Sequence, residues 1–176
     1  PMNGVIGMTG LLLDTDLSSE QREYAETLRG SGDHLLTLIN DILDLSKIEA
    51  GRFELDRVPF SLRDLFDDTV RMFAVRTNEK KLRLLCRIAP SVPDAVIGDP
   101  CRLRQVLVNL VGNAVKFTET GEVVVRIGVE RRAAGETWLH AAVRDTGIGI
   151  PAHKRQLVFE AFRQADGSTT RRYGGT

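Results

Sequence analysis

Two asparagines and a lysine are spaced so that a helix would place them on one face. Asn109, Asn113 and Lys116 stand at positions i, i+4 and i+7. A carboxamide oxygen suits Mg²⁺, which takes few protein ligands and keeps waters and phosphate oxygens in its shell. The lysine ammonium offers a positive charge to those phosphates. The three side chains could therefore bind a metal–polyphosphate, although asparagines are also common on solvated helix faces.

The segment DTGIGIP, residues 145–151, comes directly after an apolar stretch that is typical of a strand. The carboxylate of Asp145 could accept a hydrogen bond from the amino group of a base. Gly147 and Gly149 would let the backbone approach a flat ring or adopt a conformation closed to other residues. A tight turn supported by an aspartate explains the segment about equally well, and the pattern is not the GxGxxG nucleotide fingerprint.

The C-terminal segment has two further features that could contribute to such a site. Phe159 and Phe162 are spaced to pack on one side of a helical turn, which ordinary core residues also do. The tail STTRRYGGT, residues 168–176, is polar, basic and glycine-bearing. This composition is typical of a loop that closes over phosphates, and a frayed terminus is the alternative interpretation.

The helix that would carry the asparagines has a clear start signal. Asp99 precedes Pro100, and a capping carboxylate before a proline at the first helical position favours a helix start. The helix should run to about Phe117. Its expected buried face consists of Leu103, Val106, Leu107, Leu110 and Val111.

The rest of residues 52–176 mixes short strands and helices. We expect a strand over 53–58 ended by Pro59, a helix over 61–76 capped by Ser61, strands over 82–88, 122–130 and 138–144 with a turn near Ala134–Gly135, and a short helix near 154–162. This order predicts an α+β domain, an α/β sandwich with an antiparallel sheet.

The first 51 residues are predicted to form two helices. The first ends near Leu13, and the second starts at the capping box of Ser18 and Gln21 and ends at Gly51. A heptad-like stripe runs along the second helix through Tyr24, Leu28, Ser31, Leu35, Leu38, Ile42 and Leu45. Two helices cannot cover so wide a face, which favours a homodimer through residues 1–49 that completes a four-helix bundle. A hairpin packed on its own domain is the alternative.

Composition excludes several other classes of function. The chain has 176 residues, with 24 lysines and arginines and 24 aspartates and glutamates. A net charge near zero gives no footprint for nucleic acid or an anionic membrane. Cys86 and Cys101 lack zinc-ligand spacing and are expected to be reduced, partly buried thiols. His34, His140 and His153 are too far apart to suggest a metal site.

Taken together, the motifs resemble a known family in their types and in their order. NLVGNAVKF (109–117) resembles the N box of histidine kinases, DTGIGI (145–150) the G1 box, FEAF (159–162) the F box and RRYGGT (171–176) the first half of the G2 box. LINDILDLSKIEAG (38–51) resembles the second dimerisation helix of hybrid-type sensor kinases. PMNGVIGM (1–8) resembles the segment directly after their H box.

The resemblance implies a Bergerat-type ATP-binding domain over residues 52–176, after a partial dimerisation and phosphoacceptor hairpin over 1–51. Asn113 would bind Mg²⁺ with Asn109 alongside, Lys116 would contact phosphate, and Asp145 would bind the adenine amino group. The remaining nucleotide-binding residues would be Gly147, Gly149, Phe159, Arg172, Gly174, Gly175 and Thr176. The implied partners are ATP, a second copy of the chain and the receiver domain of a response regulator.

The family pattern is incomplete at both ends. Its phosphoacceptor histidine would precede Pro1, so no phosphoacceptor is assigned within the chain, and the second glycine pair of the G2 box would come after Thr176. We therefore expect this chain alone not to autophosphorylate, although the full-length protein should. The resemblance also implies a cytoplasmic domain, with any inner-membrane anchor outside these residues.

Two other functions stay open. Related ATP hydrolases place a glutamate one helical turn before the metal-binding asparagine. That glutamate acts as the general base that takes a proton from the attacking water. Here that position is Asn109, an amide that cannot accept a proton at neutral pH, which favours transfer over hydrolysis. A non-enzymatic dimerisation scaffold is the third possibility, and it would dimerise without binding nucleotide.

Overall fold

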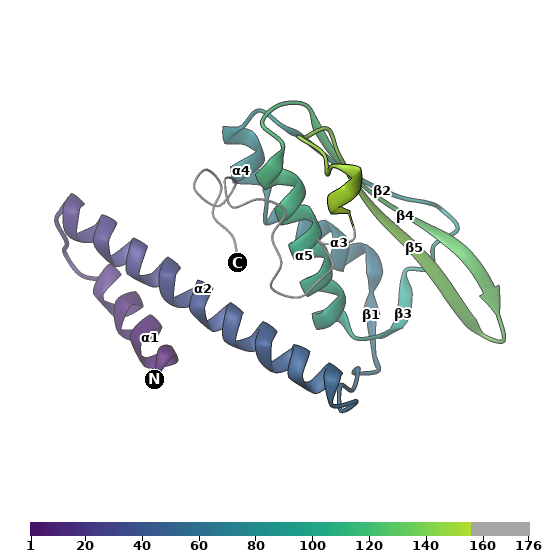
Figure 1. Cartoon of the computed structure of the whole chain (residues 1–176), viewed down its shortest axis with the longest axis horizontal. Helices are drawn as coiled ribbons and strands as arrows, with labels where there is room; N and C mark the ends of the chain where they lie inside the picture. The colour runs from purple at the N-terminus through teal and green to yellow at the C-terminus, as the bar shows by residue number, and fades with distance from the viewer. Residues whose placement is uncertain (156–176) are drawn as a thin grey trace. The chain divides into compact units, whose positions relative to one another are not determined.

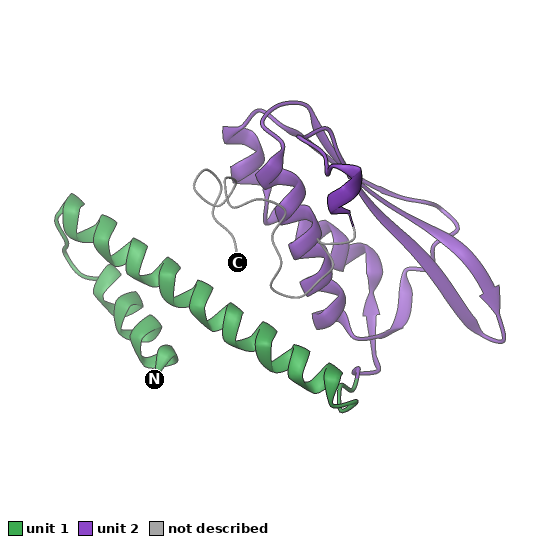
Figure 2. Ribbon diagram, viewed as in Figure 1, with its two compact units in different colours: residues 1–54 green, residues 55–176 purple. Residues whose placement is uncertain are grey.

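The computed structural model describes residues 1–155, and the chain divides into two compact units (Figures 1 and 2). The first unit comprises residues 1–54 and the second residues 55–176. None of the helices within the described part is both long enough and apolar enough to cross a membrane.

The first unit is a helical hairpin of α1 (Met2–Leu13) and α2 (Ser19–Glu49). The predicted capping box is confirmed: Gln21 N–H donates to Ser18 Oγ at 3.2 Å, and Ser18 N–H donates to Gln21 Oε1 at 3.0 Å. Ala50 and Gly51 terminate the helix as expected, and Gly51 takes the left-handed conformation with φ of +65°. Arg52 N–H then returns to the carbonyl of Lys47 at 2.9 Å, which closes a Schellman motif.

Small residues of α2 form its contact with α1. Ala25 is buried, and a β-carbon at Gly32 would lie 3.0 Å from Ile6 Cγ1. The heptad-like stripe lies elsewhere, because Tyr24 and Leu35 are 59% and 45% exposed. Within one chain α1 therefore covers a narrow line of α2 and leaves most of the predicted apolar face open.

The second unit packs helices on one face of a sheet. Its elements are β1 (Val58–Ser61), α3 (Leu62–Arg71), α4 (Ala74–Glu79), β2 (Arg83–Ile88), β3 (Ala95–Gly98), α5 (Pro100–Phe117), β4 (Glu122–Ala133), β5 (Glu136–Asp145) and the short 3₁₀ helix η1 (Ala152–Lys154). The sheet order is β2-β4-β5, and β1 pairs separately with β3. The α+β class is confirmed.

The sheet is mixed, so the expectation of an antiparallel sheet is wrong for one pair. β4 and β5 are antiparallel and are joined by a tight turn in which Ala134 and Gly135 both have positive φ. β2 and β4 are parallel, with Arg83 opposite Glu122. The long connection through β3 and α5 permits this, because parallel strands need a crossover.

Two local predictions around Pro59 are wrong. β1 begins at Val58, rather than spanning 53–58, and it includes Pro59, which pairs opposite Ile97. Proline is tolerated there because β1 and β3 form only a two-stranded ribbon, in which one edge needs no ladder N–H. The ribbon partner β3 was not predicted.

The single helix expected over 61–76 is two helices. Ser61 caps α3 as predicted, accepting from Asp64 N–H at 3.1 Å, but α3 ends at Arg71 and α4 starts at Ala74. Phe73 lies in the break and packs against the core beside Gly112 of α5. Of the helix expected near 154–162, the structure describes only the part before residue 156, where η1 ends at Lys154.

The core lies between the helices and the inner face of the sheet (Figure 1). Its most buried members are Leu62, Phe66, Leu107, Val111, Val115, Val123 and Val125. The predicted face of α5 is correct for Leu107 and Val111 and wrong for Val106 and Leu110, which are 54% and 47% exposed. Ala114 and Val115 complete the buried stripe instead, so Val106 and Leu110 turn to the side of the asparagines.

Candidate functional site

The start of α5 is fixed by the side chain of Asp99. One carboxylate oxygen accepts from Arg102 N–H at 2.9 Å, and the other accepts from Asp56 N–H at 3.1 Å. These bonds stabilise the charged form of Asp99 and hold its pKa below the usual value. The bond from Arg102 N–H has the larger effect, and the bond from Asp56 N–H adds to it. The predicted helix start is confirmed, with Pro100 in the first turn.

The three chemistry-bearing residues of α5 lie along its side away from the core. Asn109 and Asn113 are exposed, and Lys116 is half-buried in the last turn of the helix. Lys116 Nζ lies 5.2 Å from the centroid of the Phe117 ring. This stripe presents two carboxamides and an ammonium to one region of surface.

The loop after β5 starts with a turn made by Asp145. Asp145 lies opposite Val123 in the sheet, two residues after Val143, so it belongs to the inner, helix-covered face. Its Oδ1 accepts from Gly147 N–H at 2.8 Å. This Asx turn leaves the second carboxylate oxygen of an exposed side chain without a hydrogen bond inside the described residues.

Gly147 brings this loop against the end of α5. A β-carbon at Gly147 would collide with the carbonyl oxygen of Phe117 and lie 2.9 Å from Thr118 Oγ1. Ile148 N–H donates to the same Phe117 carbonyl at 3.4 Å. Two segments about 30 residues apart therefore touch, and the structure brings the Asp145 turn close to the turn of α5 that carries Lys116.

Thr146 attaches the other side of the loop to the start of β4. Its Oγ1 accepts from Glu122 N–H at 3.0 Å, and its own N–H donates to the Glu122 carbonyl at 3.2 Å. Gly121 has φ of +111°, and a β-carbon there would collide with Thr146 Oγ1. Sequence reasoning missed Gly121 and Thr146, because their importance comes from a contact between segments far apart in the chain.

A buried hydroxyl lies under the same loop. Thr118 is fully buried, and its Oγ1 is the one buried side-chain oxygen or nitrogen within residues 1–155 that has no hydrogen-bond partner. The close approach of Gly147, this orphaned hydroxyl and an amide-and-ammonium donor set on α5 fit a polar ligand with a flat part and an anionic part. A flat part and an anionic part are features of the predicted ligand, ATP.

Of the other predicted site residues, the structure describes only some. Gly149 has φ of +69°, as a glycine-specific turn requires. Phe159, Arg172, Gly174, Gly175 and Thr176 lie outside the described residues. No group of three histidine, cysteine, aspartate or glutamate side chains in the described part could hold a metal ion. The assignment of the metal to Asn113 stays a prediction from the sequence.

The three histidines and two cysteines of the described residues differ in how far they are exposed. His34, His140 and His153 are exposed. Both thiols are free as expected, but only Cys86 is half-buried, and burial raises its pKa; Cys101 is exposed, contrary to the prediction.

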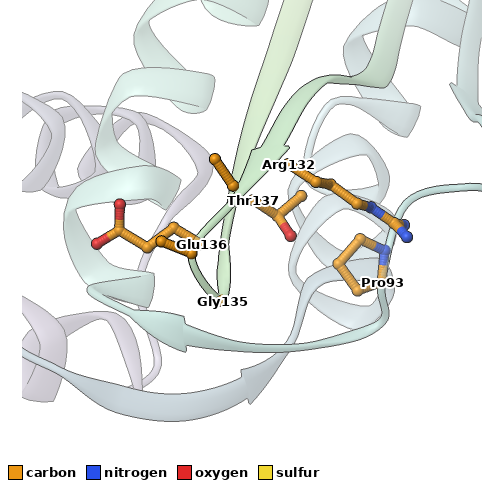
Figure 3. Close-up of a pocket in the computed structure, with 7 residues that line it drawn as sticks. Pro93, Arg132, Gly135, Glu136 and Thr137 are labelled. Atoms are coloured by element: carbon orange, nitrogen blue, oxygen red, sulfur yellow. The ribbon is translucent and has the colours of Figure 1, made fainter.

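A surface hollow of about 490 Å³ lies at the β4–β5 turn rather than at the Asp145 loop (Figure 3). It is lined by Pro93 and by residues of the hairpin, including Arg132, Glu136 and Thr137. Arg132 also donates to the carbonyl of Ser91. None of the α5 or loop candidates lines this hollow, so it is separate from the candidate site.

Comparison with known proteins identifies the class. The His Kinase A (phospho-acceptor) domain matches residues 1–51, and the histidine kinase-, DNA gyrase B- and HSP90-like ATPase matches residues 98–176. The fold is thus that of an ATPase-type domain preceded by a helical hairpin.

Individual relatives agree over the whole chain. The signal transduction histidine-protein kinase BarA of Escherichia coli K12 is 49% identical over 178 residues, covering 100% of this chain and 19% of BarA. The sensor protein GacS of Pseudomonas syringae is 46% identical over 176 residues, with the same two coverages of 100% and 19%. The crystal structure of full-length ShkA in complex with AMPPNP superposes with a TM-score of 0.74 at 39% identity, covering 97% of this chain and 36% of ShkA.

The chain belongs to the sensor histidine kinase family, whose phosphoacceptor and ATPase domains match residues 1–51 and 98–176. It spans about a fifth of the length of these two curated relatives.

Proposed function

We propose that this core binds Mg-ATP between the exposed stripe of α5 and the Asp145–Gly149 loop. In the longer protein it would transfer the γ-phosphate to a histidine of the dimerisation hairpin, for relay to a receiver aspartate. The observation that carries the proposal is the contact of Gly147 with the Phe117 carbonyl, because it brings the adenine candidate close to the phosphate candidate.

Each described residue has a defined role in this proposal. The free oxygen of Asp145 accepts from the adenine amino group, while Gly147 N–H holds the other oxygen. Gly147 and Gly149 keep the wall of the adenine site free of side chains. Asn113 would hold Mg²⁺ with Asn109 beside it, and the ion would neutralise developing phosphate charge. Lys116 contacts phosphate.

The undescribed candidates and the partners belong to the same proposal. Phe159, Arg172, Gly174, Gly175 and Thr176 would complete the nucleotide site. The open apolar face of α2 supports a homodimer through residues 1–49. Family membership favours a cytoplasmic location and a response-regulator receiver domain as the phosphate acceptor.

Transfer is favoured over hydrolysis by the amide at Asn109. A hydrolase needs a base beside the attacking water, and an amide cannot take a proton at neutral pH. Asn109 is exposed one turn before Asn113, where it can orient a ligand but cannot activate water.

The test is a specificity swap measured by calorimetry. Asp145→Asn keeps the oxygen that accepts from Gly147 N–H and presents an NH₂ donor to the base. The amino group of adenine would then face the NH₂ group of Asn, and two donors cannot form a hydrogen bond. Hypoxanthine has an oxygen in place of the amino group, and this oxygen can accept from the NH₂ group. We expect Asp145→Asn to bind Mg-ATP at least about tenfold more weakly, a loss of about 1.4 kcal/mol or more, and to gain relative affinity for Mg-ITP.

The metal role has its own pair of variants. Asn113→Ala should reduce the magnesium-dependent part of ATP binding. Asn78→Ala, which changes an exposed asparagine on α4, is the matched control.

Two outcomes would contradict the proposed function. Equal ATP affinity of Asp145→Ala and unmodified protein would remove the adenine assignment. A chain that dimerises and binds no nucleotide would favour the scaffold alternative.

A further inference from the structure

We propose that Lys80 is a positioning residue of the nucleotide site, which fixes the end of α5 against the Asp145–Gly149 loop. The inference rests on the proposed function, since it concerns how that site is held. Lys80 lies between α4 and β2, far in sequence from every proposed ligand contact.

The ammonium of Lys80 binds the last turn of α5 through three carbonyl oxygens. Nζ donates to the carbonyl of Val115 at 2.8 Å, and to those of Lys116 and Thr118 at 3.2 Å each. The last carbonyls of a helix have no partner within the helix, so they need donors from elsewhere. An ammonium has three N–H donors, and its positive charge suits the negative end of the helix dipole.

The backbone of Lys80 is itself held firmly. Leu82 N–H donates to the Thr77 carbonyl at 2.9 Å and Lys81 N–H to the Asn78 carbonyl at 3.0 Å, which closes a Schellman motif at the end of α4. Lys81 takes the left-handed position with φ of +54°, although it is not glycine. Leu82 is buried in the core next to this motif. The lysine thus extends from a fixed base.

The carbonyls that Lys80 holds flank the one that the nucleotide loop contacts. Phe117 lies between Lys116 and Thr118, and its carbonyl receives Ile148 N–H and the close approach of Gly147. If the three bonds of Lys80 are lost, the last turn of α5 can fray. Lys116 and the surface beneath the Asp145 turn then lose their fixed positions together.

This role differs from direct contact with phosphate. All three donors of the Lys80 ammonium are used by backbone carbonyls, so its charge serves the helix end rather than a ligand. Its removal should therefore affect the geometry of the site, including adenine recognition, and should not act only on the phosphates.

The experiment compares Lys80→Met with the core variant Ile127→Ala, below the unfolding temperature of each. Methionine keeps the length of the side chain and removes the donors. Ile127 is buried in β4, four residues beyond Val123, which lies opposite Asp145, so its truncation should destabilise the unit without removing a hydrogen bond of Lys80. We expect Lys80→Met to weaken Mg-ATP binding about tenfold, equivalent to about 1.4 kcal/mol. Ile127→Ala should bind within about twofold of the unmodified protein, and Lys80→Arg should retain most of the affinity because it keeps donors and charge.

Hydrogen exchange without nucleotide separates this inference from the proposed function. We expect faster amide exchange over 116–118 and 145–151 in Lys80→Met and no such change in Ile127→Ala. Unchanged exchange there, or equal loss of affinity in both variants, would overturn the role of Lys80. If the unmodified chain does not bind ATP, the proposed function fails, and the exchange result still decides the positioning role. If Lys80→Met does not fold, Lys80→Gln, which keeps two N–H donors, should give a smaller shift in the same direction.

Discussion

The Cα atom of Gly147 lies so close to Phe117 that a β-carbon would collide with its carbonyl oxygen and lie 2.9 Å from its carbonyl carbon. The obstacle is backbone at the end of a packed helix, which cannot move aside as the tip of a flexible side chain can. The approach therefore makes glycine necessary at this point and couples the loop after β5 to α5.

Gly147→Ala should move the loop away from α5 and weaken Mg-ATP binding at least about tenfold, while costing about 1–3 kcal/mol of stability. The matched control is Gly112→Ala in α5, where the nearest atom to a new β-carbon is 3.7 Å away in the Phe73 ring. That change should be neutral or stabilising by about 0.5–1 kcal/mol, because alanine favours a helix interior. Calorimetry and urea denaturation measure the two effects. Unchanged nucleotide affinity in Gly147→Ala would contradict the coupling.

Leu35→Glu should convert a dimer into a monomer. Leu35 belongs to the stripe of α2 that one chain leaves open, at 45% exposure. An ionised glutamate within an apolar bundle costs on the order of several kcal/mol unless the helices separate. Asn40→Glu, at an exposed polar position of the same helix, should leave the dimer intact. Sedimentation equilibrium of the three proteins decides the matter, and an unmodified chain that is already monomeric at high concentration would contradict the expectation.

His34→Gln should have no effect on phosphorylation. Transfer to histidine needs an imidazole nitrogen in line with the γ-phosphate and a neighbouring group to orient the ring. His34 is exposed on α2, and its ring forms no hydrogen bond or ion pair within the described residues. We expect no acid-labile label on this chain after incubation with γ-labelled ATP, and the same result for His34→Gln. Label on the unmodified chain that disappears in His34→Gln and persists in His140→Gln would show that His34 is an acceptor.

The stability that Asp99 provides should depend on pH. The pKa of Asp99 is lowered in the folded protein by the N–H groups that donate to its carboxylate. The contribution of Asp99 to the free energy of unfolding is therefore complete above the usual aspartate pKa. The contribution declines as pH falls toward and through the lowered pKa. Asn is a good capping residue without this titration. The unfolding free energy of the unmodified protein should exceed that of Asp99→Asn most at neutral pH, and the difference should shrink in acid. A difference that stays constant from about pH 7 to about pH 3 in urea titrations would refute this account.

Much of the architecture was predictable because its signals are local. The capping box of Ser18, the left-handed Gly51 and the start of α5 at Asp99 depend on neighbours within a few residues, and all three are confirmed. The four ordered motifs likewise identified the family from residue types and their order.

The remaining features of the fold depend on contacts between distant segments, which no local pattern encodes. The parallel pairing of β2 with β4 and the ribbon that contains Pro59 result from how the chain returns to the sheet. The exposure of Val106 and Leu110 results from which side of α5 meets the sheet, and periodicity alone cannot resolve adjacent positions on a helix.

The candidate site shows the same division. Residue types and spacing suggested Asn109, Asn113, Lys116 and Asp145, because their chemistry can be recognised one residue at a time. No local pattern indicates that Lys80 should reach the end of α5 or that Gly121 must make room for Thr146. Such residues act through atoms far away in the sequence, and folding alone brings those atoms within reach.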